Sequence, residues 1–572
     1  MAFLVHGIAR LNQIIRGGGG GRGELENGDV SSESGRSVDS IRLEEEKAVR
    51  NSEQKELDGK LNSLLEKPGS IKSLVQTLSR LNFQIPPEQS LSLFKTLSNC
   101  LLQTDILELI MSEEEDNTMQ DMRSRKSLSY VSSVLICFGP INLCQAIASS
   151  DKALGLLLDI FHSEEYVDQR VILNVCSVLH AVLLTSPLEV LRAIASRGSD
   201  IAAMVYYLDI DAVAELLVNI LESTCSSTVH PKAFQSALPI LSNERIFHLL
   251  ATRLEECAEE AENDFDCRNT LDNLEFTFRS LVSNLNSKYV KYQTNVAMKM
   301  LDIYREVEPV CRMLNAGLHA AESDSDAHAL RVSVKILSGL LESFNETRTD
   351  ETMNRLEPIE QVLFSKAFGL ISVVDEVLVA GSIQPSPLLG LNRLEIVDLF
   401  ATAFEVCTMK TCEALITMGV LGSFLELLYQ FKQNSLLHVR VARGIDALLA
   451  RSDTMMRKLI FFRFSLVPRV MDLWDLNTNP VRGQDYAEYR SVLSLISYSI
   501  WNCLNSSRTD CPSDDLESLI STSALAEFDR FTKQIGGDRL NEDRSGWPFG
   551  APGGHLCTAA SSELARMNNS HL

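Results

Sequence analysis

The side chains best suited to acid–base or metal chemistry are the ten histidines, and none has a chemical partner at motif spacing. A dinuclear hydrolase site groups histidines with carboxylates, and zinc proteases carry two histidines four residues apart. The chain contains no H-x-H, H-E-x-x-H or G-D-x-H-G sequence, no G-x-S-x-G elbow, and no kinase or P-loop signature. We therefore expect no catalytic residues. An enzyme without recognisable motifs is the remote alternative.

Cysteines and carboxylates are not spaced for metal binding either. None of the thirteen cysteines forms a C-x-x-C pair, and Cys407 and Cys412 have no histidine nearby. The odd count favours free thiols in a reducing compartment. Asp209 and Asp211 flank a turn, where helix capping is the expected role. The acidic run from Glu255 to Asp266 is typical of a solvated helix face, with docking of a basic partner as the alternative. We expect no metal and no cofactor.

Composition sets the class of protein. The chain has 572 residues, of which 45% are hydrophobic, so it has enough apolar side chains for a large core. Its formal net charge of −23 argues against a nucleic-acid-binding surface and against attraction to anionic lipid. No window of 18 apolar residues is free of charge, so we expect no membrane span.

Several short helices are predicted between residues 386 and 450. The first carries apolar residues at i, i+3 and i+4 spacing, and a second, from Lys410 to Met418, stops at Gly419. A third runs from Val420 to Tyr429, and a fourth begins after a polar break. No single helix of this kind can bury its apolar face alone, so such helices stack. The stripe of the first helix is Leu394, Val397, Phe400, Ala401 and Phe404; that of the fourth is Leu437, Val441, Ile445 and Leu448.

The same helical pattern extends over residues 57–535. Examples are a helix that we expect Asp151 to cap, a helix from Gln169 to Leu184, and a helix starting near Pro468. We predict an all-α, armadillo/HEAT-like helical solenoid. Residues 1–56 and 536–572 are rich in Gly, Ser, Glu, Pro or Asn, and we expect both segments to be mostly disordered. An organelle-targeting helix over Met1 to Arg16 is an alternative for the first residues.

A family resemblance follows from the central stretch. Gly390, Arg393 and Leu394, followed by the run from Leu425 to Tyr429 and by Asn434, Leu437, His438 and Val441, resemble the core of the SAPS domain. That domain defines regulatory subunits of protein phosphatase six, a type-2A-like serine/threonine phosphatase. The segments at 131–221 and 458–475 are similar to the family as well. Two positions depart from it: Gln433 stands where the family has Trp, and Arg440 where it has Gln.

The resemblance implies a non-catalytic regulatory or scaffold subunit. Its partner would be a type-2A-like phosphatase catalytic subunit, whose substrate choice or location it directs, and a third adaptor subunit is compatible with this arrangement. The resemblance points to Arg393, Tyr429, Asn434 and His438 as partner-binding residues. It also implies a cytoplasmic protein, with the nucleus as a further compartment. An armadillo-like adaptor for trafficking or cytoskeletal partners is the alternative function.

Overall fold

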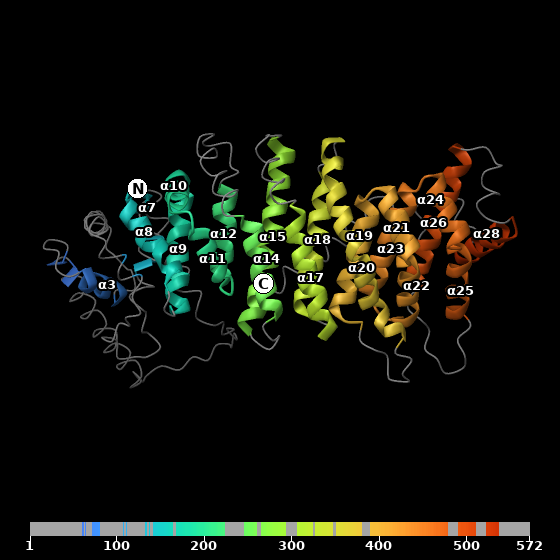
Figure 1. Ribbon diagram of the computed structural model, residues 1–572, viewed down its shortest axis with the longest axis horizontal. Helices are drawn as coiled ribbons and strands as arrows, with labels where there is room; N and C mark the ends of the chain where they lie inside the picture. Colours follow the sequence, from blue (N-terminus) through green and yellow to red (C-terminus); the bar gives the residue numbers. More distant parts are fainter. Residues whose placement is uncertain are drawn as a thin grey trace, which may run out of the picture. The chain divides into compact units, whose positions relative to one another are not determined.

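Every element in the described part of the chain is a helix, and none of these residues forms a β-strand. The all-α prediction is therefore confirmed. The helices fall into two compact units, Met1–Leu249 and Leu250–Leu572. The extension before residue 57 and the tail after residue 536 lie outside the described residues, so the predicted domain boundaries stay predictions. The computed structural model describes a few residues between 60 and 137, and residues 71–80, 141–163, 167–223, 245–259, 265–292, 306–323, 327–346, 350–379, 389–478, 490–510 and 522–536 (Figure 1).

The first unit is built around the helix α9. This helix packs against α7, α10 and α12, and its buried residues recur with helical spacing from Val171 to Leu183. Pro187 occupies the first turn of α10, where its missing N–H costs nothing, and Gly198 ends that helix at φ 72°. The bounds are α3 (Ile71–Arg80), α7 (Ile141–Ala148), α8 (Asp151–Asp159), η1 (Ile160–His162), α9 (Gln169–Thr185), α10 (Pro187–Arg197), α11 (Asp200–Tyr206) and α12 (Asp211–Ser223).

The cap of α8 differs from the predicted one. The Ser150 side chain accepts the hydrogen bond from the N–H of Ala153 at 3.2 Å, and Asp151 is the first helical residue. Both residue types cap helices and they are adjacent, so spacing alone does not distinguish them. Asp151 still places a negative charge in the first turn, where the helix dipole favours it.

A fully buried carboxylate, Asp200, joins three helices of the first unit. His162 Nε2 lies 2.8 Å from Asp200 Oδ1, and Arg197 Nε donates to the same oxygen at 2.9 Å. Arg197 also donates to Asp159 of α8 at 2.5 Å. Burial disfavours the charged form of Arg197, but its two carboxylate partners outweigh that effect and raise its pKa. These four side chains thereby fix α8, η1 and α10 against the start of α11.

The second unit contains several longer helices. It contains the central stretch, where all four predicted helices are present and Gly419 closes one of them at φ 107°. Pro468 lies in the first turn of α25, as expected. The bounds are α14 (Ile246–Glu259), α15 (Phe265–Tyr292), α17 (Val307–Ser323), α18 (His328–Glu346), α19 (Asp350–Val379), α20 (Leu391–Val406), α21 (Met409–Met418), α22 (Val420–Gln430), α23 (Ser435–Arg451), α24 (Thr454–Lys458), η2 (Leu459–Arg463), α25 (Leu466–Thr478), α26 (Arg490–Asp510) and α28 (Thr522–Gly536).

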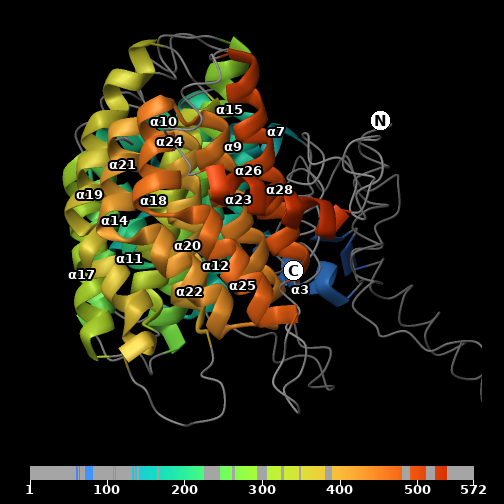
Figure 2. The same cartoon turned by 90° about the vertical axis from the view of Figure 1, so that its right-hand side faces the viewer.

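One row of helices in this unit is formed by α15, α18, α20, α23 and α26, each packed on the next. Figure 1 shows them side by side in chain order. A second row includes α17 and α19, and Figure 2 places these two on the opposite side from α23 and α26. We call the first set the inner row. The solenoid-like array was predicted, and the structure confirms it.

Helices of the inner row run parallel to one another. Asn392 Nδ2 donates to Ala327 O at 2.9 Å near the start of α20 and α18, and Ser338 contacts Thr402 further along both. The helix α17 runs antiparallel to α18, since the Ser333 hydroxyl donates to Met313 O at 2.8 Å and Gly317, further along α17, lies against Leu330, nearer the start of α18. This alternation of direction is what a chain of helical hairpins produces.

Aromatic side chains fill the joints between these helices. Phe404 of α20 meets Phe424 of α22 edge to face, with ring centroids 6.0 Å apart. Trp474 of α25 is buried against Phe531 of α28 at a centroid distance of 5.4 Å. Among the described residues no single helix is long and apolar enough to cross a membrane. Two pairs of helices joined at a bend, α9 with α10 and α21 with α22, have the length and apolar composition of a membrane span when each pair is taken together.

A glycine permits the close approach of α20, α22 and α23. A Cβ built on Gly444 would lie 2.9 Å from a ring carbon of Phe424 and 3.1 Å from Ala401 Cα. We predict that Gly444→Ala lowers the free energy of unfolding of this unit by about 1–3 kcal/mol, because overpacking forces the helices apart. Urea unfolding followed by circular dichroism measures the loss.

Gly422→Ala is the matched control within α22. A Cβ there meets only Phe464 at 3.9 Å, which is an ordinary contact, and alanine is the better helix former. The control should leave stability unchanged or raise it. Equal destabilisation by both substitutions would contradict the role assigned to Gly444.

Candidate partner-binding face

Arg393, the first of the four predicted binding residues, is mostly buried in α20. Its guanidinium donates to two backbone carbonyls, to Val373 O of α19 at 3.2 Å and to Leu389 O at 3.1 Å. These bonds fix the start of α20 against α19. The side chain is thus placed as a connection between helices.

The other three predicted residues lie together where α22 passes into α23. Asn434 caps α23 by accepting from the N–H of Leu437 at 3.0 Å, and His438 Nε2 lies 3.1 Å from Phe431 O inside the turn. Tyr429 is exposed, with the Lys432 ammonium 4.8 Å from its ring centroid. Of the four, Tyr429 is the one that offers a large accessible side chain. The binding role of all four stays a prediction.

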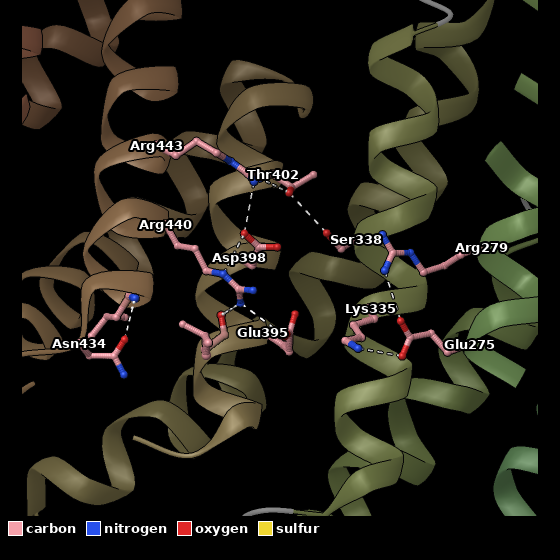
Figure 3. A network of polar contacts seen from close by, with 12 residues as sticks. Glu275, Arg279, Lys335, Ser338, Glu395, Asp398, Thr402, Asn434, Arg440 and Arg443 are labelled. Carbon is pink, nitrogen blue, oxygen red and sulfur yellow. Dashed lines mark hydrogen bonds and ion pairs between the residues drawn. The ribbon is translucent and has the colours of Figure 1, made fainter. Parts of the chain in front are cut away.

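Polar side chains cross the inner row in a line that we call the polar ladder (Figure 3). Each of its members comes from one face of its helix and reaches toward the neighbouring helix. Most of these side chains are partly buried, so their pairing is less screened by water than that of surface pairs. The ladder consists of Glu275 and Arg279 of α15, Lys335 and Ser338 of α18, Glu395, Asp398 and Thr402 of α20, and Arg440 and Arg443 of α23.

The first joint of the ladder links α15 to α18. Lys335 Nζ donates to Glu275 Oε2 at 2.9 Å, and Arg279 reaches the other carboxylate oxygen at 3.3 Å. Ser338 then meets Thr402 of α20 at 3.4 Å, with both hydroxyls buried. Glu275 is therefore held from two helices at once.

The second joint links α20 to α23 through two arginines. Arg443 donates to Thr402 at 2.5 Å and to Asp398 at 3.3 Å, while its Nε lies 3.0 Å from Glu405. Arg440 donates to Leu394 O at 2.8 Å. A guanidinium has five donors in a fixed fork, so a single side chain satisfies several acceptors on the adjacent helix.

Beyond the ladder, two contacts extend the same kind of link. Arg451 of α23 donates to Phe404 O and Cys407 O, both at 2.7 Å, and so satisfies carbonyls that the end of α20 leaves open. Asp446 accepts from Ser499 of α26 at 2.5 Å. Polar links therefore run without interruption from α15 to α26.

Exposed apolar side chains lie on the same helix faces as the ladder. Leu391 is four residues before Glu395, and Leu436 and Val439 precede Arg440 and Arg443 at i+4 spacing. Phe276 of α15 is exposed as well. A surface of satisfied polar groups with accessible apolar side chains resembles the composition of protein–protein interfaces. We call this surface the ladder face, defined by the polar ladder and by Phe276, Leu391, Leu436 and Val439.

The chemistry of the described cysteines is that of apolar core side chains. Most of them are buried, and burial raises the pKa of Cys137, Cys176 and Cys412 to about 12. Thiolate is the reactive form, so these groups are unreactive at neutral pH. Within the described helices, no three histidine, cysteine, aspartate or glutamate side chains are grouped to hold a metal ion.

Sequence reasoning did not find the ladder. Its signal was available in part, because Glu395, Asp398 and Thr402 recur at helical spacing, as do Arg440 and Arg443 with Leu436. What spacing does not reveal is that the two stripes face each other across a joint. From the sequence, Arg440 is distinguished only by standing where the family has Gln.

Removing one ladder arginine tests the second joint. We predict that Arg443→Met, which keeps the aliphatic stem, lowers the free energy of opening of α20 and α23 by about 1–3 kcal/mol, since charged hydrogen bonds are lost. Hydrogen exchange of the amides in these helices measures the effect. The matched control is Arg279→Met, whose half-exposed i,i+4 pair should contribute less than about 0.5 kcal/mol. An equal effect of both variants would contradict the prediction.

The carboxyl group of Glu405 gives a pH test. Burial raises its pKa, with repulsion from Glu342 and Asp398 acting in the same direction against attraction to Arg443. A raised folded pKa gives stability that is present below the usual glutamate pKa and is lost as the pH rises through the folded value. We predict that Glu405→Gln, which is neutral throughout, gains stability relative to the wild type as the pH rises from about 4 to 7. The difference in urea midpoint between the two proteins measures it.

Asp272 should give the opposite trend and serves as the comparison. Burial alone would raise its pKa, but His328, Arg331 and Lys335 together hold it below its usual range. Its stabilising effect is present above the usual aspartate pKa and lost as the pH falls through the folded value. Asp272→Asn should therefore be less stable than the wild type near neutral pH, with a difference that shrinks below about pH 4. The same trend in both variants would overturn the assignment of opposite shifts.

Comparisons with known proteins give a limited set of similarities. No protein-family model matches the chain. Among solved structures, the crystal structure of Uso1-1 is 13% identical with a TM-score of 0.28, covering 84% of this chain and 92% of that chain. An engineered protein is 13% identical with a TM-score of 0.24, covering 75% and 97%. Uso1-2 is 12% identical with a TM-score of 0.23, covering 87% and 90%. Scores this low do not establish a shared fold.

A curated protein gives a longer match. The chain is similar to serine/threonine-protein phosphatase 6 regulatory subunit 3 of Gallus gallus, with 18% identity over 419 residues. The match covers 67% of this chain and 46% of that protein. The chain thus spans about half the length of the curated relative it matches.

Proposed function

We propose that this protein is a non-catalytic regulatory subunit that binds the catalytic subunit of a type-2A-like serine/threonine phosphatase, with phosphatase 6 as the first candidate. The observation that carries the proposal is the 419-residue similarity to a phosphatase 6 regulatory subunit. The central stretch from Gly390 to Val441, which resembles the SAPS domain, points to the same family. The protein would act in the cytoplasm, and also in the nucleus, by setting the substrates or the location of the phosphatase.

The ladder face is the surface that we assign to this partner. Its polar groups are already paired within the chain, so a partner can cover them without leaving charges unpaired. The accessible apolar side chains Leu391, Leu436 and Val439 lie next to them and would supply the area that loses water on binding. Rigid parallel helices also keep this surface preformed, which lowers the entropic cost of association.

Reconstitution tests the proposal. We predict that the purified full chain binds purified phosphatase 6 catalytic subunit, that the two co-elute from a sizing column, and that the chain alone does not hydrolyse phosphopeptides. Biolayer interferometry gives the dissociation constant. If no complex forms, and affinity purification from the source cell recovers trafficking or cytoskeletal proteins instead, the adaptor alternative replaces the proposal.

A pair of matched variants tests the assigned surface. Leu436→Asp on the ladder face should weaken binding roughly tenfold or more, because it places a charge in an apolar contact. Leu184→Asp in α9 is the control, because Leu184 is 74% exposed and lies outside the ladder face. Tyr429→Ala tests the predicted binding residue that has a large accessible side chain. Binding that survives Leu436→Asp unchanged would remove the ladder face from the proposal while leaving the partner in place.

A further inference from the structure

An irregular segment follows α23 in the second unit. The short helix α24 (Thr454–Lys458) continues into the π-helix η2 (Leu459–Arg463), where the N–H of Phe464 donates to Leu459 O at 2.8 Å, five residues back. Ser465 then takes a left-handed backbone with φ 56°. Wide turns and left-handed non-glycine residues both cost free energy and cluster at functional sites.

The wide turn changes which side chains reach water. In a regular helix, Arg463 would follow buried Met456 and Ile460 at i+7 and i+3 spacing and would face the core. The π-helix accommodates one more residue per turn, so Phe461 becomes buried five residues after Met456. Arg463 is exposed as a result.

The exposed side of this segment combines large apolar and cationic side chains. Met455 is 73% exposed and Phe462 is 72% exposed. Lys458, between them in sequence, and Arg463, next to Phe462, are exposed as well. Met455 and Lys458 are three residues apart in α24, and Phe462 follows Lys458 by four residues, close to one turn of the wider helix, so the three lie on one side of the segment. We call these four residues the basic–apolar patch.

The segment that carries the basic–apolar patch is positively charged in a strongly acidic chain. Residues 453–472 contain four basic and two acidic residues, whereas the whole chain has a formal net charge of −23. One of the two acids, Asp453, is engaged in accepting the N–H of Met456 at 2.8 Å. Behind the patch, the Arg469 guanidinium lies 4.5 Å from the ring centroid of Phe464 and helps to hold the segment in place.

We propose that the basic–apolar patch binds an acidic segment of a partner protein that carries an apolar side chain. Phe462 and Met455 cover the apolar side chain, and Lys458 and Arg463 pair with carboxylates on either side of it. An anionic membrane is the less favoured occupant, because the acidic body of the protein is repelled by such a surface. This site is separate from the ladder face and does not depend on the phosphatase proposal.

Peptide selection on the full-length chain tests the proposal. A phage-displayed library of random peptides is panned on the immobilised protein, and bound peptides should be enriched in Asp and Glu around an aromatic or leucine residue. The affinity of the best peptide, measured by fluorescence anisotropy, should fall roughly tenfold in Lys458→Glu, in Arg463→Glu and in Phe462→Ala. Binding should also weaken as salt rises, since the pairing is exposed.

Phe368→Ala is the matched control, because Phe368 of α19 is 77% exposed without belonging to the patch. It should leave the peptide affinity unchanged, and circular dichroism should show every variant folded. Lys458→Arg should bind like the wild type because it keeps the charge. The proposal is overturned if no acidic peptides are selected, if their affinity is insensitive to Phe462→Ala, or if the patch instead mediates binding to vesicles containing phosphatidylserine.

Discussion

Hydrogen bonds from the side chains of one helix to defined acceptors on the next fix the register in which parallel helices stack. This constraint determines how the inner row of the second unit packs. Apolar stripes alone allow neighbouring helices to slide by one turn at modest cost, because leucine and valine side chains pack in many ways. Arg440, Arg443 and Arg451 remove this freedom, since each donates to carbonyls or carboxylates at one position along α20. Hydrophobic burial supplies the driving force, and the arginines select the arrangement.

Fixing the register with charged side chains costs hydration free energy, which ion pairs between neighbouring helices offset. Partly buried charges lose hydration, and Glu405 shows the loss directly, since burial raises its pKa even beside Arg443. Asp272, which is held by His328 and lies nearer to solvent, shows the opposite shift. The joints therefore combine one carboxylate that is poorly solvated with others that are well paired. Such a joint stabilises a particular geometry more than it adds to the total stability.

Helix positions could be predicted from the sequence because helical periodicity is a local property. The apolar spacing from Leu394 to Phe404 and the glycine at 419 define α20 and the end of α21 without reference to the rest of the chain. Contacts between helices are not local. Arg393 is predicted to bind a partner, and the structure also shows its guanidinium donating to the carbonyl of Val373 in the neighbouring helix α19, a contact that its own spacing does not reveal. Likewise, the π-helix η2 buries Phe461 and leaves Arg463 exposed, which a regular 3.6-residue period does not predict.

The alternation of charge along the polar ladder limits how this array can change in length. Carboxylates of α15 meet the lysine of α18, and carboxylates of α20 meet the arginines of α23. Loss of α18 alone would leave Glu275 without Lys335 and place it next to the helix that carries Glu395 and Asp398, and loss of α20 alone would place Lys335 next to the helix that carries Arg440 and Arg443; each change brings like charges closer together. Loss or duplication of two successive inner helices, each with its outer companion, would restore the alternation. Evolutionary growth and shrinkage of the array should therefore proceed in steps of two repeats.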